Sequence, residues 1–136
     1  MEQNIIESFK LATTRNNIGI CGQRLLLLLM ELATEERTNE GLNLKSEKDI
    51  RKVEVGAWGD RLVTLPLTDL MGDSENYSAV KSSILALQKE IIEYEEENGA
   101  WVAFPVLSTV RMNKKTVTVK VNGLLWKVLQ GDLPLQ

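Results

Sequence analysis

The sequence has no histidine and only one cysteine, Cys21, among its 136 residues. Without histidine there is no Ser-His-Asp catalysis and no histidine metal site, and a single cysteine cannot close an internal disulfide. We expect Cys21 to be a reduced packing residue near a helix start; the alternative, a redox thiol, has no resolving partner in the chain. The chain therefore lacks the residues on which most familiar hydrolase mechanisms depend. We expect neither enzymatic activity nor a cofactor.

Long apolar runs are also missing. The longest, Leu25–Met30, has six residues, far below the roughly 20 that span a bilayer. The segment Met1–Lys10 mixes charged with apolar residues and does not have the pattern of a signal peptide. These absences predict a cytoplasmic protein that does not bind a membrane.

What the sequence contains is typical of one ordered domain. Hydrophobic residues make up 43% and charged residues 26%, close to the usual values for globular chains. We expect a single domain over residues 1–136, with loose ends at 1–10 and 132–136.

Charge is unevenly distributed along the chain. The net charge is −3 overall, but residues 53–99 carry three basic and ten acidic side chains, whereas residues 100–136 carry five basic and one acidic. The negative net charge argues against a protein that coats nucleic acid over its whole surface. A local cationic region can still hold phosphate, because fields decay within a Debye length of about 8 Å.

The first half of the chain predicts a long helix followed by a strand. Leucines recur at helical spacing within residues 23–36. The additional apolar residues Leu26, Leu27 and Met30 leave two alternatives: the helix is sunk in the core, or it presents a stripe to a partner. Residues 38–52 are predicted to form a loop, and Leu62–Leu65 a strand.

The middle predicts two helices across a tight turn. Thr68 is a suitable N-cap for one turn through Met71, ended by Gly72. A second helix is predicted over residues 75–93, because apolar residues recur on one face at steps of three and four; these are Tyr77, Val80, Ile84, Leu87 and Ile91.

The last third predicts a hairpin and a closing helix. Residues 101–106 with Val110 are predicted to form one strand, and Thr116–Val121, which alternates cleanly, the other. Residues 111–115 are the polar tip, with Asn113 suited to positive φ. Leu124–Leu129 is predicted to form a short helix that ends at Gly131.

This order of elements predicts an α+β fold, a winged helix, in which a β-hairpin forms the wing beside a helix-turn-helix. The interpretation requires one continuous helix over residues 75–93 and a segment 101–121 that folds back on itself.

The residues also resemble a family. The stretch 62–104, LVTLPLTDLMGDSENYSAVKSSILALQKEIIEYEEENGAWVAF, is similar to the first winged-helix domain of bacterial plasmid replication initiator proteins, the RepA/RepB-like group. The stretches 22–32, GQRLLLLLMEL, and 117–129, VTVKVNGLLWKVL, resemble that domain's first long helix and its closing strand and helix.

The resemblance, over roughly residues 10 to 130, implies DNA replication initiation at plasmid origin DNA in the bacterial cytoplasm. Family members recognise repeated origin sites, load host replication proteins and open the duplex without enzymatic chemistry. They usually carry two tandem winged helices, of which the first dimerises and contacts the backbone and the second reads bases. The present sequence accounts for only one winged helix. We therefore expect it to be the first domain of a two-domain initiator or a shortened relative.

Two sets of candidate residues follow from this interpretation. The wing is expected to contact phosphates, since its cationic side chains position a protein without reading sequence; the alternative is a charged tip that only maintains solubility. The predicted helix offers few base-reading side chains, and for its two lysines a plain solvated face is the alternative. The candidates for DNA-backbone contact are Arg111, Lys114, Lys115, Lys120, Lys81 and Lys89.

A homodimer is expected to form through the sheet, by resemblance and because an open edge strand is a pairing surface. Trp101 and Trp126 are possible anchors, although aromatic residues of this kind are more often core. The candidate dimer-surface residues are Trp101, Val102, Phe104, Val106 and Thr118.

Three other functions stay open from the residues alone. A winged-helix transcription regulator shares the architecture but needs a basic recognition helix. A protein-interaction module that never touches DNA is favoured by the acidic middle third. A metal site at Asp69, Asp73 and Glu75 is the least supported, because these carboxylates have the spacing of caps and turn residues.

Overall fold

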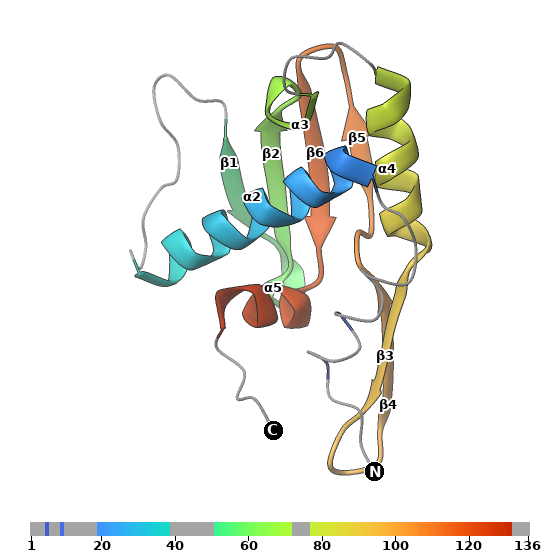
Figure 1. The fold of residues 1–136 in the computed structure, drawn as a ribbon. Helices are drawn as coiled ribbons and strands as arrows, with labels where there is room; N and C mark the ends of the chain where they lie inside the picture. The colour runs from blue at the N-terminus through green and yellow to red at the C-terminus, as the bar shows by residue number, and fades with distance from the viewer. Residues whose placement is uncertain (1–4, 6–8, 10–18, 39–50, 72–76, 132–136) are drawn as a thin grey trace.

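The computed structural model describes residues 5, 9, 19–38, 51–71 and 77–131, which form a mixed α+β structure (Figure 1). In chain order the elements of these residues are α2 (Gly19–Thr38), β1 (Lys52–Val55), the 3-10 turn η1 (Ala57–Gly59), β2 (Arg61–Pro66), α3 (Thr68–Met71), α4 (Tyr77–Lys89), β3 (Ile91–Glu95), β4 (Trp101–Pro105), β5 (Val110–Met112), β6 (Thr116–Val121) and α5 (Gly123–Gln130).

The strands form two antiparallel sheets. The larger has the order β1-β2-β6-β5, and the smaller is the hairpin β3-β4. The last strand, β6, is therefore central, with Val119 opposite Val63 of β2 on one side and Val110 of β5 on the other. The alternation predicted for residues 116–121 is confirmed: its valines are fully buried, and Thr118 on the other face contacts Thr64 through their hydroxyls at 3.1 Å.

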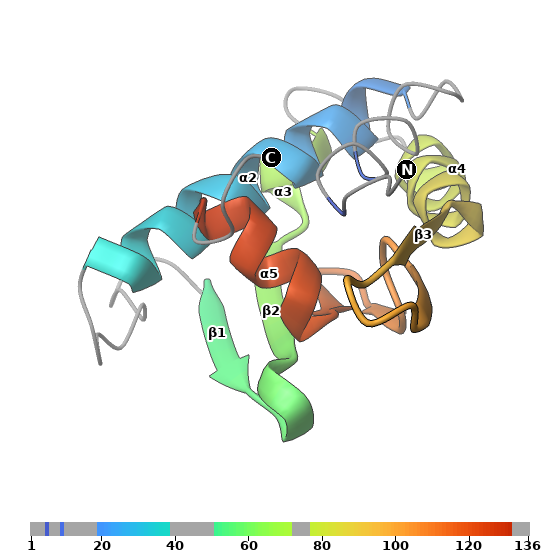
Figure 2. The ribbon, with the colours of Figure 1, turned by 90° about the horizontal axis from the view of Figure 1, so that it is seen from below.

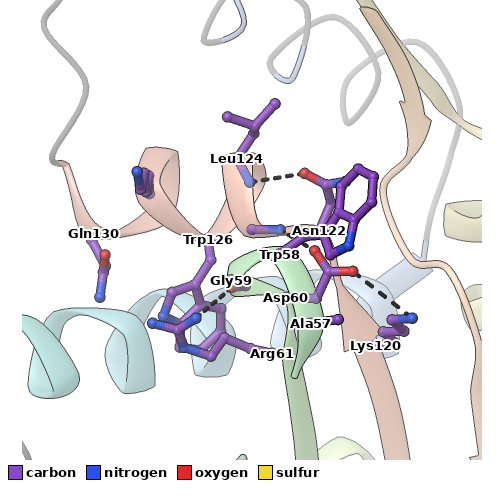
Figure 3. Close-up of a pocket in the computed structure, with 12 residues that line it drawn as sticks. Ala57, Trp58, Gly59, Asp60, Arg61, Lys120, Asn122, Leu124, Trp126 and Gln130 are labelled. Atoms are coloured by element: carbon purple, nitrogen blue, oxygen red, sulfur yellow. Dashed lines mark hydrogen bonds and ion pairs between the residues drawn. The ribbon is translucent and has the colours of Figure 1, made fainter. Parts of the chain in front are cut away.

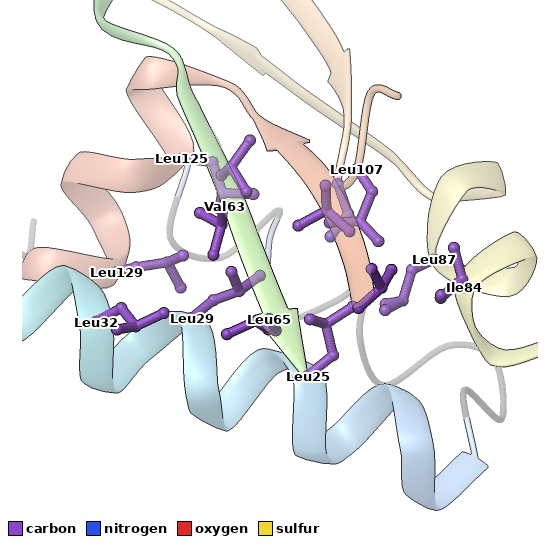
Figure 4. Packing of buried hydrophobic residues seen from close by; sticks show 14 of the residues in the cluster. Leu25, Leu29, Leu32, Val63, Leu65, Ile84, Leu87, Leu107, Leu125 and Leu129 are labelled. Atoms are coloured by element: carbon purple, nitrogen blue, oxygen red, sulfur yellow. The ribbon is translucent and has the colours of Figure 1, made fainter. Parts of the chain in front are cut away.

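The helices cover one face of the larger sheet. Helix α2 crosses that face and α5 lies at its lower end, as Figures 1 and 2 show. Leu25, Leu29 and Leu32 of α2 are buried with the inner side chains of the sheet (Figure 4). The core alternative is confirmed for these three residues, while Leu27 and Met30 leave apolar surface exposed on α2.

Helix α4 is shorter than the sequence predicts. The prediction of a helix through residue 93 is wrong, because α4 ends at Lys89 and residues 91–95 form β3. Ile91 continues the helical spacing of α4, but Ile92 and Tyr94 also alternate with glutamates, and the period of two prevails. The backbone N–H of Val106 donates to the carbonyl of Glu90 (2.9 Å) and joins the new strand to the chain after β4.

The predicted hairpin is also divided differently. Residues 101–105 do not pair with β6; they pair with β3, with Trp101 opposite Glu95. The short strand β5 pairs with β6 instead, so Arg111 and Met112 belong to a strand and only residues 113–115 form the turn. The segment 101–121 thus contributes to two hairpins.

Several shorter predictions are confirmed. The helical turn at residues 68–71 and the strand around 62–65 are present, and Gly131 ends α5 at φ 77°. Within the segment 1–10, expected to be loose, Ile5 is buried and Phe9 packs against the core, and the other residues of this segment lie outside the described ones. The predictions for residues 39–50, Gly72, Asp73, Glu75 and 132–136 lie outside the described residues.

Candidate nucleic-acid interface

The tip of the β5–β6 hairpin is a defined turn. The side-chain oxygen of Asn113 accepts the backbone N–H groups of Lys115 (2.7 Å) and Thr116 (2.8 Å). Asn113 is suited to positive φ but does not adopt it; its side-chain amide instead satisfies backbone donors of the turn. The turn is attached to the body by Leu67 N–H donating to the Lys115 carbonyl (2.9 Å) and by the Tyr77 hydroxyl donating to the Lys114 carbonyl (3.2 Å).

The structure gathers some of the candidate cations and separates others. Lys114 and Lys115 are exposed at the tip beside the start of α4 (Figure 1), and Arg111 is exposed on the adjoining strand. Lys81, on the first turns of α4, lines a groove with Met112 of β5. Lys114 and Lys115 thus lie at the turn, while Arg111 pairs with Thr118 farther along the hairpin.

Lys120 and Lys89 lie elsewhere. Lys120 is five residues farther along β6 than Lys115, about 17 Å at the usual strand rise. Its ammonium pairs with Asp60 at 3.8 Å. Lys89 ends α4, about 12 Å along the helix from Lys81. Neither therefore lies with Lys114 and Lys115 at the β5–β6 turn.

The candidate dimer surface is reduced to two residues. Phe104 and Val106 are buried in the core, so they cannot form a surface of the folded chain. Thr118 lies on the central strand β6 and offers no open edge. Trp101, which is 67% exposed, and the half-buried Val102 remain on the β3–β4 hairpin.

A pocket at the other end of the larger sheet was missed by sequence reasoning (Figure 3). It has a volume of about 490 Å³ and lies between η1, the end of β6 and α5. Trp58 lines it, is 97% exposed and adopts the left-handed conformation at φ 64°. The flanking Gly56 and Gly59 indicated a break in the strand, but nothing in the sequence distinguished an exposed indole from a core one. Its charged or aromatic lining residues are Trp58, Asp60, Arg61, Lys120, Trp126 and Lys127.

A polar cluster behind this pocket joins α2, β2 and α5. The Arg61 guanidinium donates to the Glu36 carboxylate at 2.6 to 3.1 Å, and Trp126 and Gln130 also donate to it at 3.4 Å. The hydrogen bonds from Arg61 and its positive charge hold the pKa of Glu36 below its usual value, although burial opposes them. Arg61 also lies 5.8 Å from the centre of the Trp126 ring. Trp126, a possible dimer anchor, is fully buried, so it belongs to the core.

The described residues hold no group of three or more potential histidine, cysteine or acidic metal ligands. Asp69, the described member of the predicted acidic triplet, forms an ion pair with Arg51 at 2.9 Å. Over the same ranges no helix is both long and apolar enough to cross a bilayer.

Comparison with protein-family models, with curated proteins and with solved structures gave no match. The resemblance to plasmid replication initiators therefore stays a prediction.

Proposed function

We propose that this chain is a winged-helix domain of a plasmid replication initiator, which dimerises and contacts the DNA backbone at origin repeats. The observation that carries the proposal is the order of the larger sheet. A winged helix has a helix, a strand, a helix-turn-helix and two wing strands, with the last strand between the other two. Here α2, β2, α3, α4, β5 and β6 follow in that order, and β6 lies between β2 and β5.

The shortened α4 fails one requirement of the winged-helix interpretation and leaves the strand order as its structural support. The expectation of one helix over residues 75–93 is not met, and the proposal rests on strand order instead. Strand β1, hairpin β3–β4 and helix α5 are additions to the core topology. The hairpin is inserted between α4 and the wing, which explains why the predicted wing strand at 101–106 pairs elsewhere.

The chemistry of the wing favours backbone contact over base reading. The exposed cations Lys114 and Lys115 lie at the tip, with Arg111 exposed on the adjoining strand β5. Phosphate contacts of this type fix position without carrying sequence information. The exposed positions of α4 include Ser78, Ser82 and Leu85, which provide few bidentate base contacts. Its only exposed cations are Lys81 and Lys89, so base-reading side chains on this helix are few. Base reading is then the task of another domain.

The test is DNA affinity as a function of salt. The 136-residue chain is titrated against a fluorescent 20-base-pair duplex, as wild type and as Lys114→Glu with Lys115→Glu. Each phosphate contact contributes about −0.9 to the slope of log K against log salt, so losing two contacts makes the slope shallower by about 1.8. Anisotropy measured between low and moderate salt gives both slopes.

A matched control carries Lys52→Glu with Lys89→Glu, which makes the same change in net charge at exposed positions away from the wing. We expect the slope of log K against log salt for this variant to stay within about 0.5 of the wild-type slope, which is less than the contribution of one phosphate contact. An equal reduction of the salt slope in both variants would show that the overall charge of the chain, rather than the wing, determines DNA binding.

The replication step has its own test. The coding sequence with its flanking DNA is placed on a carrier that cannot replicate in a bacterial host, and plasmid maintenance is scored. Maintenance that depends on the two wing lysines supports the proposal and places the chain in the bacterial cytoplasm, with host replication proteins as further partners.

One observation favours a second candidate, a protein-interaction module without DNA binding. The β3–β4 hairpin carries an exposed Trp101 and four exposed glutamates with no basic residue among them; these are Glu93, Glu95, Glu96 and Glu97. Acidic charge at this density repels phosphate. Absence of any salt-dependent DNA binding by the wild-type chain would favour this module over the initiator, and over a transcription regulator as well.

A further inference from the structure

The η1 turn presents Trp58 to solvent in a fixed position. The Gly56 N–H donates to the Asp60 carbonyl (2.7 Å), and the Asp60 N–H donates back to the Ala57 carbonyl (3.1 Å). The Gly123 N–H, at the start of α5, donates to the Asp60 carboxylate at 2.8 Å. Positive φ is unfavourable for a bulky residue, so the surrounding hydrogen bonds are needed to hold Trp58 there.

Gly123 packs against this turn more closely than any other residue type allows. A Cβ at Gly123 would lie 2.7 Å from the carbonyl oxygen of Trp58 and 2.9 Å from the carbonyl carbon of Gly59. The turn and the helix are thus locked backbone to backbone. Since an exposed and rigid tryptophan is typical of interaction anchors, this arrangement points to a docking role.

The pocket beside Trp58 is cationic. Arg61, Lys120 and Lys127 line it together with one carboxylate, Asp60. Arg61 is neutralised by Glu36 behind the pocket. Lys127 is exposed and forms no ion pair within the part of the chain that the structure describes, and the Lys120 side chain is 46% exposed with only the 3.8 Å contact to Asp60. The pocket therefore fits an acidic segment.

The chain itself carries a segment of that chemistry. No basic residue occurs between Lys89 and Arg111, and the carboxylates of Glu95, Glu96 and Glu97 are exposed around the β3–β4 turn. The Glu96 N–H donates to the Ala100 carbonyl (2.9 Å), so the turn is ordered. The described residues of β3 and β4 are not among those that line the pocket.

We propose that the pocket around Trp58 receives the acidic β3–β4 turn of a second copy of this chain. Lys120 and Lys127 pair with Glu96 and Glu97 of the partner copy, and Trp58 packs against the partner's turn. The two surfaces differ, so a two-fold dimer makes the contact twice and an open arrangement repeats it head to tail. The inference deepens the homodimer of the proposed function and rests on it.

The test is self-association of the full chain by sedimentation, with charge reversal on each surface. A pocket variant carries Lys120→Glu with Lys127→Glu, and a turn variant carries Glu96→Lys with Glu97→Lys. Two lost ion pairs at about 0.7 kcal/mol each weaken self-association by roughly tenfold. Trp58→Ala is expected to weaken it to a similar extent, and circular dichroism checks that every variant folds.

The decisive measurement is an equal mixture of the two reversed variants. Each variant alone brings like charges together, whereas in the mixture both kinds of contact again join opposite charges. We expect association of the mixture at the wild-type level. The control, Lys81→Glu with Lys89→Glu on α4, makes the same change in net charge and is expected to leave self-association unchanged.

The outcomes separate this inference from the proposed function. A wild-type dimer that neither reversal weakens, or a mixture no tighter than its components, overturns the pocket contact and leaves the dimer standing. If the wild-type chain is a monomer at high micromolar concentration, both the pocket contact and the proposed homodimer are overturned. The DNA titration tests the phosphate contacts independently of that result. Binding of single-stranded oligonucleotide at Trp58 by a monomeric chain assigns the pocket to nucleic acid and also overturns the inference.

Discussion

The hairpins β3–β4 and β5–β6 are built around turns with the same chemistry. In the first, the side-chain oxygen of Asn98 accepts the N–H of Ala100 at 2.9 Å; in the second, Asn113 accepts that of Lys115 at 2.7 Å. Their surroundings differ. One strand of β5–β6 is the centre of the larger sheet, whereas β3–β4 forms a separate two-stranded sheet (Figure 1).

The two turns also carry opposite charge and lie at opposite ends of the molecule (Figure 1). Lys114 and Lys115 surround one turn, and Glu96 and Glu97 the other. The chain therefore uses one local structure twice, once as an extension of the core and once as an appendage. Similar turns therefore form both hairpins, whereas the strands that pair with each hairpin determine how much it contributes to stability.

The largest expected effect is on stability. Val119→Ala on β6 removes a fully buried side chain and is expected to lower the free energy of unfolding by about 2–3 kcal/mol. The same substitution at Val102 on β4, which is half-buried, is expected to cost less than about 1 kcal/mol. Urea unfolding of both variants measures the difference. If both substitutions lowered the free energy of unfolding equally, the β3–β4 hairpin would contribute as much to the core as β6 does.

A smaller effect is expected where the larger sheet is tied to its helices. Glu36→Gln weakens the contact with Arg61 of β2 and is expected to lower the free energy of unfolding by about 1–2 kcal/mol at pH 7. Because the folded state lowers the pKa of Glu36, its contribution is present above the unfolded value of about 4.3 and is lost as the pH falls below it. Wild type and variant should therefore converge in acid.

Urea unfolding at pH 7, 5 and 3 follows that convergence. Glu31→Gln on the same helix is the control, since Glu31 is exposed, and it is expected to stay within about 0.5 kcal/mol of wild type at each pH. A constant gap between wild type and Glu36→Gln down to pH 3 would contradict the assigned role of the carboxylate.

The smallest effect concerns the electric field of the acidic hairpin. Burial raises the pKa of Tyr94 on β3, and the negative charge of Glu96 raises it further. Glu96→Gln is expected to lower the pKa of Tyr94 but to leave it above its ordinary value, because burial remains. Titration of the tyrosine ring by NMR measures the shift. No shift would mean that solvent screens the turn completely.

Much of the larger sheet could be predicted from periodicity. The valines of β6 alternate without exception, and the leucines of α2 keep helical spacing, so one period dominates each segment. Around Ile91 two periods overlap: the residue continues the spacing of α4 and also opens β3. Local pattern cannot resolve such an overlap, since the strand is fixed by its pairing with residues 101–105.

Lys114 and Lys115 were predictable as a cluster because they adjoin the β5–β6 turn. Lys120 was grouped with them by sequence distance, but a strand carries it to the far end of the sheet, where it meets Asp60. The Trp58 pocket depends on residues from η1, β6 and α5, which are about 60 positions apart. That separation explains why no local pattern revealed it.

The pairing of β2 with β6 joins Arg61 to Val121 across 60 positions of the chain. The central strand is thus synthesised after most of its neighbours, and the sheet can close only when residue 121 has left the ribosome. Until then β1 and β2 expose one unpaired edge to other nascent chains. Because contacts between distant positions form more slowly than local ones, we expect this long-range closure to be the slow step in folding of the larger sheet.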